Sequence, residues 1–169
     1  MSHKAFAFDW RRFESDELYP LIVSALKSDE VACLIAYIEK YLTELKDPYE
    51  GEPLEQTWQE LLENYDVHEY SDFALTRFYN PAADLGVAEA WLEIDNSLTE
   101  TERGVFLGLP IHSTATVFDP GRMGSYFQTP EQVLNSLKIV AKLCIKPVES
   151  FKKLLEDCSQ NGLGIYVTF

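Results

Sequence analysis

The spacing of apolar residues near the start of the chain predicts two consecutive helices. The first is expected over 15–28, where Pro20 fits a first turn and four residues face inward: Leu21, Ile22, Ala25 and Leu26. The second is expected to begin after Ser28-Asp29-Glu30. Its apolar positions recur at helical spacing from Val31 to Leu45, and Asp47-Pro48 would end it.

The pattern is weaker through the middle of the chain. A third helix is expected to begin at Pro53, with five residues on one side: Leu54, Trp58, Leu61, Leu62 and Tyr65. Alternation over 73–78 predicts a short strand that Asn80-Pro81 would end. Residues 85–98 fit either a helix or a strand, and we favour a helix because four residues form a helical stripe: Val87, Ala90, Trp91 and Ile94.

Two capping boxes mark helix starts in the second half. Thr99 to Glu102 predicts a short helix over 100–107, and Thr129 to Gln132, with proline at the first helical position, predicts another after residue 129. The second helix has a clear apolar stripe: Val133, Leu134, Leu137, Val140, Ala141 and Cys144. Both helices are therefore predicted by local chemistry as well as by periodicity.

Strands and turns complete the expected fold. Residues 114–118 are typical of a strand, and Asp119 to Arg122 has the proline and glycine of a type II turn. A last helix should begin at Pro147 and be capped by Asn161-Gly162, before a terminal strand over 164–169. The sequence predicts a helix-dominated α+β fold with a small antiparallel sheet of short strands.

Composition adds the size and setting of this fold. A chain of 169 residues with 46% apolar and 13% aromatic residues is typical of a single globular domain, here 1–169. Neither a signal-peptide pattern nor a membrane-length apolar run is present. Three cysteines lie on apolar helical patterns and are expected to be buried, reduced thiols: Cys33, Cys144 and Cys158. These features predict a cytoplasmic protein.

Charge narrows the range of partners. The net charge is −14, and it is uneven: residues 1–66 carry −9, 67–111 carry −6 and 112–169 carry +1. Such a field disfavours nucleic acid and anionic membranes, which bind through cationic side chains, and it favours a basic protein partner. An acidic surface that serves only solubility explains the charge equally well.

The sequence gives only weak support for a metal site or a catalytic site. Asp66, His68, Glu69 and Asp72 have oxygen and nitrogen ligand atoms, but no metal-binding motif supports a metal site. His112 beside Ser113 lacks the setting of an activated nucleophile. Glu89, Glu93 and Asp95 are explained more simply by a solvated helix face. We expect no metal, no cofactor and no catalytic residue, although an enzymatic activity is not excluded.

The segment FDPGRMGSYFQTPEQ, residues 118–132, superficially resembles a phosphate-binding loop. It matches neither the Walker nor the dinucleotide glycine pattern, and a turn followed by a capping box explains most of it. The alternative function is therefore a small-ligand or enzyme site in the 119–129 loop, with Arg122, Tyr126 and His112 as its candidate residues. Whether Arg122 pairs with one of the chain's own carboxylates decides part of this question.

The acidic, tyrosine-bearing stretch 49–72 gives the leading functional hypothesis. Trp58 and Tyr65 are expected in the core, whereas Tyr49 and Tyr70 are expected in exposed loops among carboxylates. Small acidic proteins that inhibit toxins share this character, although the likeness is one of class and not of motif. We therefore expect a non-enzymatic immunity- or inhibitor-type protein, with homo-oligomer formation left open. Its expected partner-binding residues are Tyr49, Glu52, Glu55, Glu60, Glu63, Asp66, Glu69, Tyr70 and Asp72.

Overall fold

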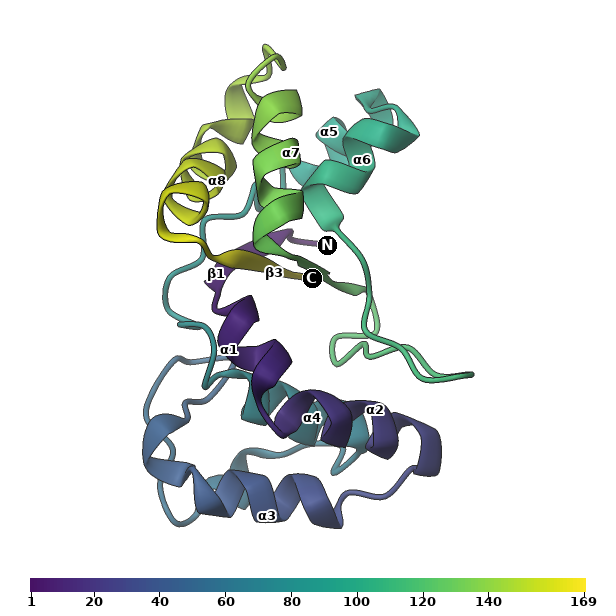
Figure 1. Ribbon diagram of the computed structural model, residues 1–169, viewed down its shortest axis with the longest axis vertical. Helices are drawn as coiled ribbons and strands as arrows, with labels where there is room; N and C mark the ends of the chain where they lie inside the picture. Colours follow the sequence, from purple (N-terminus) through teal and green to yellow (C-terminus); the bar gives the residue numbers. More distant parts are fainter.

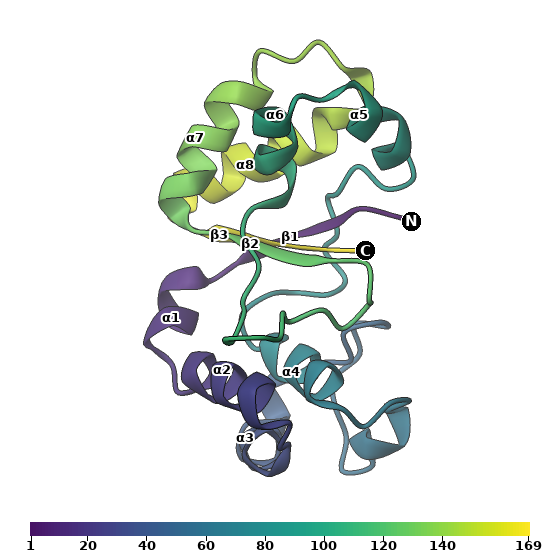
Figure 2. The same cartoon turned by 90° about the vertical axis from the view of Figure 1, so that its right-hand side faces the viewer.

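A computed structural model describes residues 1–169 and shows a three-stranded antiparallel sheet between two layers of helices (Figures 1 and 2). The strands are β1 (Lys4–Phe8), β2 (Ser125–Gln128) and β3 (Gly164–Thr168), in the order β1-β3-β2. In register, Phe6 pairs with Tyr166, which also pairs with Phe127. The α+β class with a small antiparallel sheet is confirmed.

The lower layer of Figure 1 comes from the first half of the chain. Its helices are α1 (Trp10–Ser15), α2 (Leu18–Ser28), α3 (Ala32–Lys40) and α4 (Val67–Leu75). Two short 3-10 helices lie between α3 and α4: η1 (Leu42–Glu44) and η2 (Trp58–Leu61). The second and third predicted helices are thus largely wrong in extent, because α3 ends at Lys40 and only η2 forms after Pro53.

The upper layer comes from the second half of the chain (Figure 2). It contains α5 (Trp91–Ser97), α6 (Glu100–Leu107), α7 (Pro130–Val140) and α8 (Glu149–Asn161), the last preceded by the 3-10 helix η3 (Lys146–Val148). Both predicted capping boxes are present, and Gly162 ends α8 with a left-handed backbone. The helical interpretation of 85–98 is confirmed for its second half.

Alternation along the strands gives each layer its own core. On β3, Tyr166 faces the lower layer, whereas Ile165 and Val167 face the upper layer. On β1, Phe8 packs below and Ala5 above. The lower core has 25 buried residues and the upper core 15. The sheet therefore shields two separate apolar clusters, one on each face.

Several elements differ from the sequence predictions. Residues 73–75 belong to α4 instead of a strand, and 114–118 form only an isolated bridge between His112 and Val117. The strands β1 and β2 were not predicted. The turn at Asp119 is not of type II, because the positive φ falls on Arg122 (56°) and not on Gly121. No helix combines the length and apolar character needed to span a bilayer.

Candidate functional site

The segment between α3 and α4 contains most of the acidic residues predicted to bind a partner. It leaves α3, runs along the lower right of Figure 2 and returns to α4. Asp47 fixes its first turn, because Oδ1 accepts hydrogen bonds from the backbone N–H of Tyr49 (2.7 Å) and Glu50 (3.3 Å). Lys46 Nζ donates to Asn80 Oδ1 at 3.0 Å and anchors the segment to the chain beyond α4. This long connection is thus held in one shape.

A second carboxylate fixes the end of the segment. Glu69 accepts three hydrogen bonds from the backbone N–H groups of residues 63, 64 and 65, at 2.7 to 2.8 Å, and is only 2% exposed. Asp66 caps α4 by accepting from the N–H groups of His68 and Glu69. The turn places Tyr65 in a left-handed backbone with φ 56°. Glu69 and Asp66 therefore hold the backbone of residues 63–69 in place through hydrogen bonds.

Five other carboxylates of the segment are exposed and form no ion pair within the chain. The same segment exposes three large side chains: Tyr49 at 57%, Leu61 at 46% and Tyr65 at 55%. A pocket of about 320 Å³ beside Trp58 and Leu61 is lined by three of the glutamates, Glu50, Glu52 and Glu55. We call this surface the acidic face, and its members are Tyr49, Glu50, Glu52, Glu55, Glu60, Leu61, Glu63 and Tyr65.

The expected roles of two tyrosines are reversed. Tyr70 is 4% exposed and belongs to the lower core, whereas Tyr65 is 55% exposed. The reason is that α4 begins at Val67, so Tyr70 lies one turn into a buried helix and Tyr65 lies on the turn before it. Trp58 is buried and Tyr49 is exposed, as predicted.

Asp72 also lies inside the molecule and not on the acidic face. Its side chain is in the buried part of α4, and its Oδ1 accepts a hydrogen bond from the hydroxyl of Tyr166 at 3.1 Å. Burial raises the pKa of Asp72 to about 7, although the bond from Tyr166 acts in the opposite direction. The predicted binding set therefore loses Glu69, Tyr70 and Asp72 to the interior.

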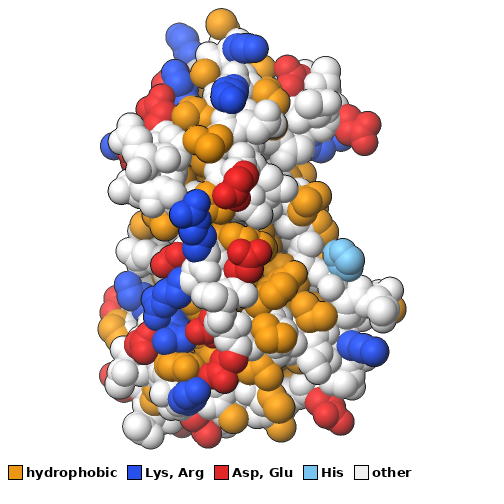
Figure 3. Space-filling view, in the orientation of Figure 1, with side chains coloured by type: hydrophobic (Ala, Val, Ile, Leu, Met, Phe, Trp, Pro, Cys, Tyr) orange, Lys and Arg blue, Asp and Glu red, His pale blue; other side chains and the backbone are white.

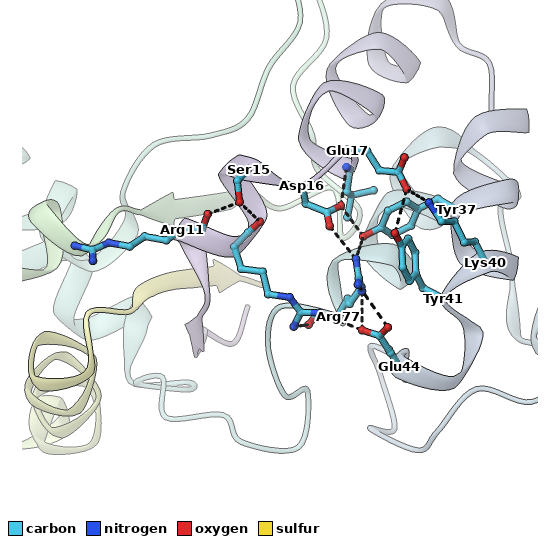
Figure 4. A network of polar contacts seen from close by, with 11 residues as sticks. Arg11, Ser15, Asp16, Glu17, Tyr37, Lys40, Tyr41, Glu44 and Arg77 are labelled. Carbon is cyan, nitrogen blue, oxygen red and sulfur yellow. Dashed lines mark hydrogen bonds and ion pairs between the residues drawn. The ribbon is translucent and has the colours of Figure 1, made fainter.

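Three acids near the ends of the neighbouring helices, Asp16, Glu17 and Glu44, are paired within the chain (Figure 4). Arg77 donates from Nη1 to Asp16 Oδ2 and from Nε to Glu44 Oε2, both at 2.8 Å, and its guanidinium stacks 3.5 Å above the Tyr41 ring. Hydrogen bonding by Arg77 holds the pKa of Glu44 below its ordinary value. Arg11 points away from this network in Figure 4. The network joins the residues just before α2, the 3-10 helix η1 and the chain just beyond α4, and it explains why Glu44 is not part of the acidic face.

The face of the molecule seen in Figure 3 has charges of both signs. Lys and Arg side chains follow one side of it, with Asp and Glu side chains between them. Exposed ion pairs of the lower layer include Lys40–Glu17 (2.7 Å) and Arg12–Glu44 (3.0 Å). Five exposed glutamates without an ion pair lie close together in the sequence, between residues 50 and 63.

The second predicted site, around Arg122, is only partly assembled. Arg122 is exposed and forms no ion pair, and it shares a pocket with Asp66, His68 and Asp119. Tyr126 lies on β2, with its ring against Gly124, and His112 is exposed with Nδ1 at 3.0 Å from the Ser113 carbonyl oxygen. Two carboxylates beside Arg122 make the pocket unfavourable for an anion.

The loop around Arg122 is explained largely by its own hydrogen bonds. Asp119 Oδ1 accepts from the N–H groups of Met123 (3.1 Å) and Gly124 (2.9 Å). The Asp119 N–H donates to His68 Nδ1 at 3.1 Å and ties the loop to α4. The ligand-binding role of Arg122, Tyr126 and His112 stays a prediction.

The remaining candidates from the sequence have ordinary structural surroundings. No three His, Cys, Asp or Glu side chains converge as a metal site would require. Ser113 Oγ donates to the Thr116 carbonyl, and Asp95 pairs with Arg103. The expectation of three buried thiols is wrong for two of them, because only Cys158 is buried; Cys33 and Cys144 are exposed.

Comparison with known proteins adds no family. No protein-family model, no curated protein and no solved structure matches this chain.

Proposed function

We propose that this protein is a non-enzymatic interaction protein of the immunity or inhibitor type, whose acidic face binds a basic protein. One observation carries the proposal: five exposed glutamates that form no ion pair lie within residues 50–63, on the same segment as the exposed side chains of Tyr49, Leu61 and Tyr65. Unpaired carboxylates around exposed aromatic and aliphatic side chains favour docking on a cationic surface.

The shape of the acidic face supports a defined contact. Its turns are fixed by Asp47 and Glu69, so little ordering of the backbone is needed on binding. The pocket beside Trp58 and Leu61 has room for one long side chain, with Glu52 and Glu55 at its edge. Arginine combines a planar cation with an apolar stem, which suits this mixture of carboxylates and apolar surface.

The proposal is tested by charge reversal on the face. The triple variant Glu55→Lys, Glu60→Lys and Glu63→Lys is immobilised beside the wild type, and proteins retained from a lysate of the native host are identified by mass spectrometry. We expect a basic protein to be retained by the wild type and lost with the variant. Retention should also fall as salt rises, because exposed charges are screened.

A matched control separates the face from net charge. Glu14, Glu39 and Glu89 are exposed, form no ion pair and lie outside the acidic face. Their triple replacement by lysine changes the net charge by the same amount and should leave binding intact. Equal loss with both triple variants, or no loss with either, would contradict the acidic face as the binding surface.

A further inference from the structure

A small cavity lies behind the acidic face, where segments distant in the sequence meet. Its volume is about 60 Å³, room for about two water molecules. Lys4 of β1, Asp72 of α4 and Tyr79 line it together with three more aromatic residues: Phe6, Tyr49 and Phe169. Tyr49 and Lys4 are both exposed, so the cavity opens between them at the border of the acidic face.

The wall of this cavity depends on a close approach of two backbones. A Cβ atom at Gly121 would lie 2.6 Å from the carbonyl oxygen of Phe169, so only glycine lets the 119–122 turn reach the end of β3. Pro120 and Gly121 form this side of the cavity. Gly121 of the segment 118–132 is therefore explained by its packing against the C-terminal end of the chain.

Asp72 is a buried acid without a cationic partner. It is 6% exposed, and only its Oδ1 is hydrogen bonded within the chain, to the Tyr166 hydroxyl. Its Oδ2 and the hydroxyl of Tyr79, which is 9% exposed, form no hydrogen bond within the chain, and both atoms reach solvent. Buried carboxylates are normally paired with a cation or satisfied by several donors. Two unused polar groups therefore meet in one cavity.

We propose that this cavity receives the ammonium group of a lysine side chain from the basic partner, which pairs with Asp72 and donates to Tyr79. A lysine ammonium is a compact point charge with three donors, whereas a planar guanidinium needs more space and more acceptors. Aromatic side chains around the cavity also favour a cation. Such an anchor presupposes that the partner docks on the adjoining acidic face, so it rests on the proposed function.

The charged groups around Asp72 set the background for this pairing. Lys4 favours ionised Asp72, whereas Glu69 and Asp47 disfavour it. Partial burial, with Asp72 and Glu69 nearby, raises the pKa of Tyr49 to about 12, and burial raises the pKa values of Tyr79 and Tyr166 well above the ordinary range. All three tyrosines are therefore neutral at physiological pH, with hydroxyls that can donate or accept a hydrogen bond, and an added ammonium would be the only close cation besides Lys4.

The site is tested with a small probe that needs no partner. The titration of the Asp72 carboxyl carbon is followed by ¹³C NMR in methylammonium chloride and in tetramethylammonium chloride at equal ionic strength. We expect the proton affinity of Asp72 to be lower by about tenfold in methylammonium, which fits the cavity and places an opposite charge beside the carboxylate. Identical titrations in both salts would overturn the proposal.

Three variants make the result specific. Asp72→Asn assigns the signal, and Tyr79→Phe should reduce the difference between the two salts by removing one acceptor for the ammonium while keeping the ring. Lys4→Met should widen the difference, because a competing positive charge is lost. A wild type indifferent to methylammonium beside a responsive Lys4→Met would also overturn the proposal, since the chain's own lysine would then fill the cavity.

The outcome is separable from that of the proposed function. In one outcome, charge reversal on the acidic face abolishes partner binding while methylammonium has no effect on the titration of Asp72. That result would support the acidic face as the docking surface and reject the cavity as a site for a lysine of the partner. If methylammonium binds but the charge-reversed face retains the partner, the cavity is an ammonium site and the docking surface lies elsewhere; the partner's lysine is then excluded as its occupant.

Discussion

The two helical layers each cover one face of the sheet, but they differ in how many charged side chains they bury. The upper layer is closed by neutral contacts: His3 is fully buried against Trp91 and Phe151, and its two ring nitrogens are used by the Val87 N–H and the Phe106 carbonyl. The lower layer buries carboxylates and a guanidinium instead. Polar groups buried without full pairing are costly, so salt and partners should act mainly on the lower layer, and the two layers should differ in their response to pH.

The largest expected effect comes from removing one ring from each core. Phe8→Ala in the lower core and Phe151→Ala in the upper core should each cost about 4 kcal/mol, because each leaves a cavity in close-packed surroundings. Differential scanning calorimetry measures the effect. If the chain is one domain, as its length predicts, both variants shift a single shared transition; two transitions that respond separately would show that the layers unfold independently.

Next in size is the contrast between an internal and an exposed ion pair. Arg77→Ala leaves Asp16 and Glu44 without their shared cation and should cost about 3 kcal/mol, because the side chains of Arg77 and Asp16 are only 10% and 14% exposed. Arg103→Ala in the upper layer breaks a pair with Asp95 that is 44% and 33% exposed, and should cost less than about 1 kcal/mol. Urea denaturation compares them, and equal losses would contradict this difference between the layers.

Asp72 should give the lower layer a pH dependence of its own. Folding raises its pKa from the ordinary 3.8 to about 7, so the neutral acid is the form preferred in the folded protein. Its contribution to stability is present below about pH 4 and is lost as pH rises to about 7. Asp72→Asn should therefore stabilise the protein by about 3 kcal/mol at pH 8, with little change at pH 4. A variant equally stable to wild type at pH 8 would argue against a buried charge.

The upper layer should respond to pH in the opposite direction. Burial lowers the pKa of His3 below its ordinary 6.5, so the neutral ring is the form preferred in the folded protein. Stability is present above pH 6.5 and is lost as pH falls through the lowered value, with a slope of at most about 1.4 kcal/mol per pH unit. The difference between wild type and His3→Gln isolates this slope. Parallel stability curves for the two proteins between pH 7 and pH 5 would rule it out.

Local chemistry predicted the parts of the fold that depend on neighbours in sequence. Thr99 and Thr129 open helices through capping boxes, and Gly162 ends the last one, because these contacts span only a few residues. The last residues of α4, 73–75, were predicted as part of a strand over 73–78 for a physical reason. Nearly all its residues are buried, so it lacks the one-sided apolar stripe by which a helix is recognised.

The candidate site was predicted only in part, because carboxylates look alike in a sequence. Glu55, Glu60 and Glu63 are exposed as expected, but Glu69 binds backbone N–H groups and Asp72 lies in the interior. Which acids are free depends on which backbone donors fold back towards them. The partners of Asp72 could not be found from sequence, since Tyr166 lies 94 positions away.

By itself, the sequence determined the α+β composition, the helix caps and the concentration of negative charge before residue 112. Periodicity, caps and charge are properties of residues within a few positions of one another, so they can be read along the chain. The tertiary structure decided the sheet order, the division into two cores and the burial of Asp72. These depend on contacts between distant segments, where burial changes a surface carboxylate into an internal acid that lacks a cation.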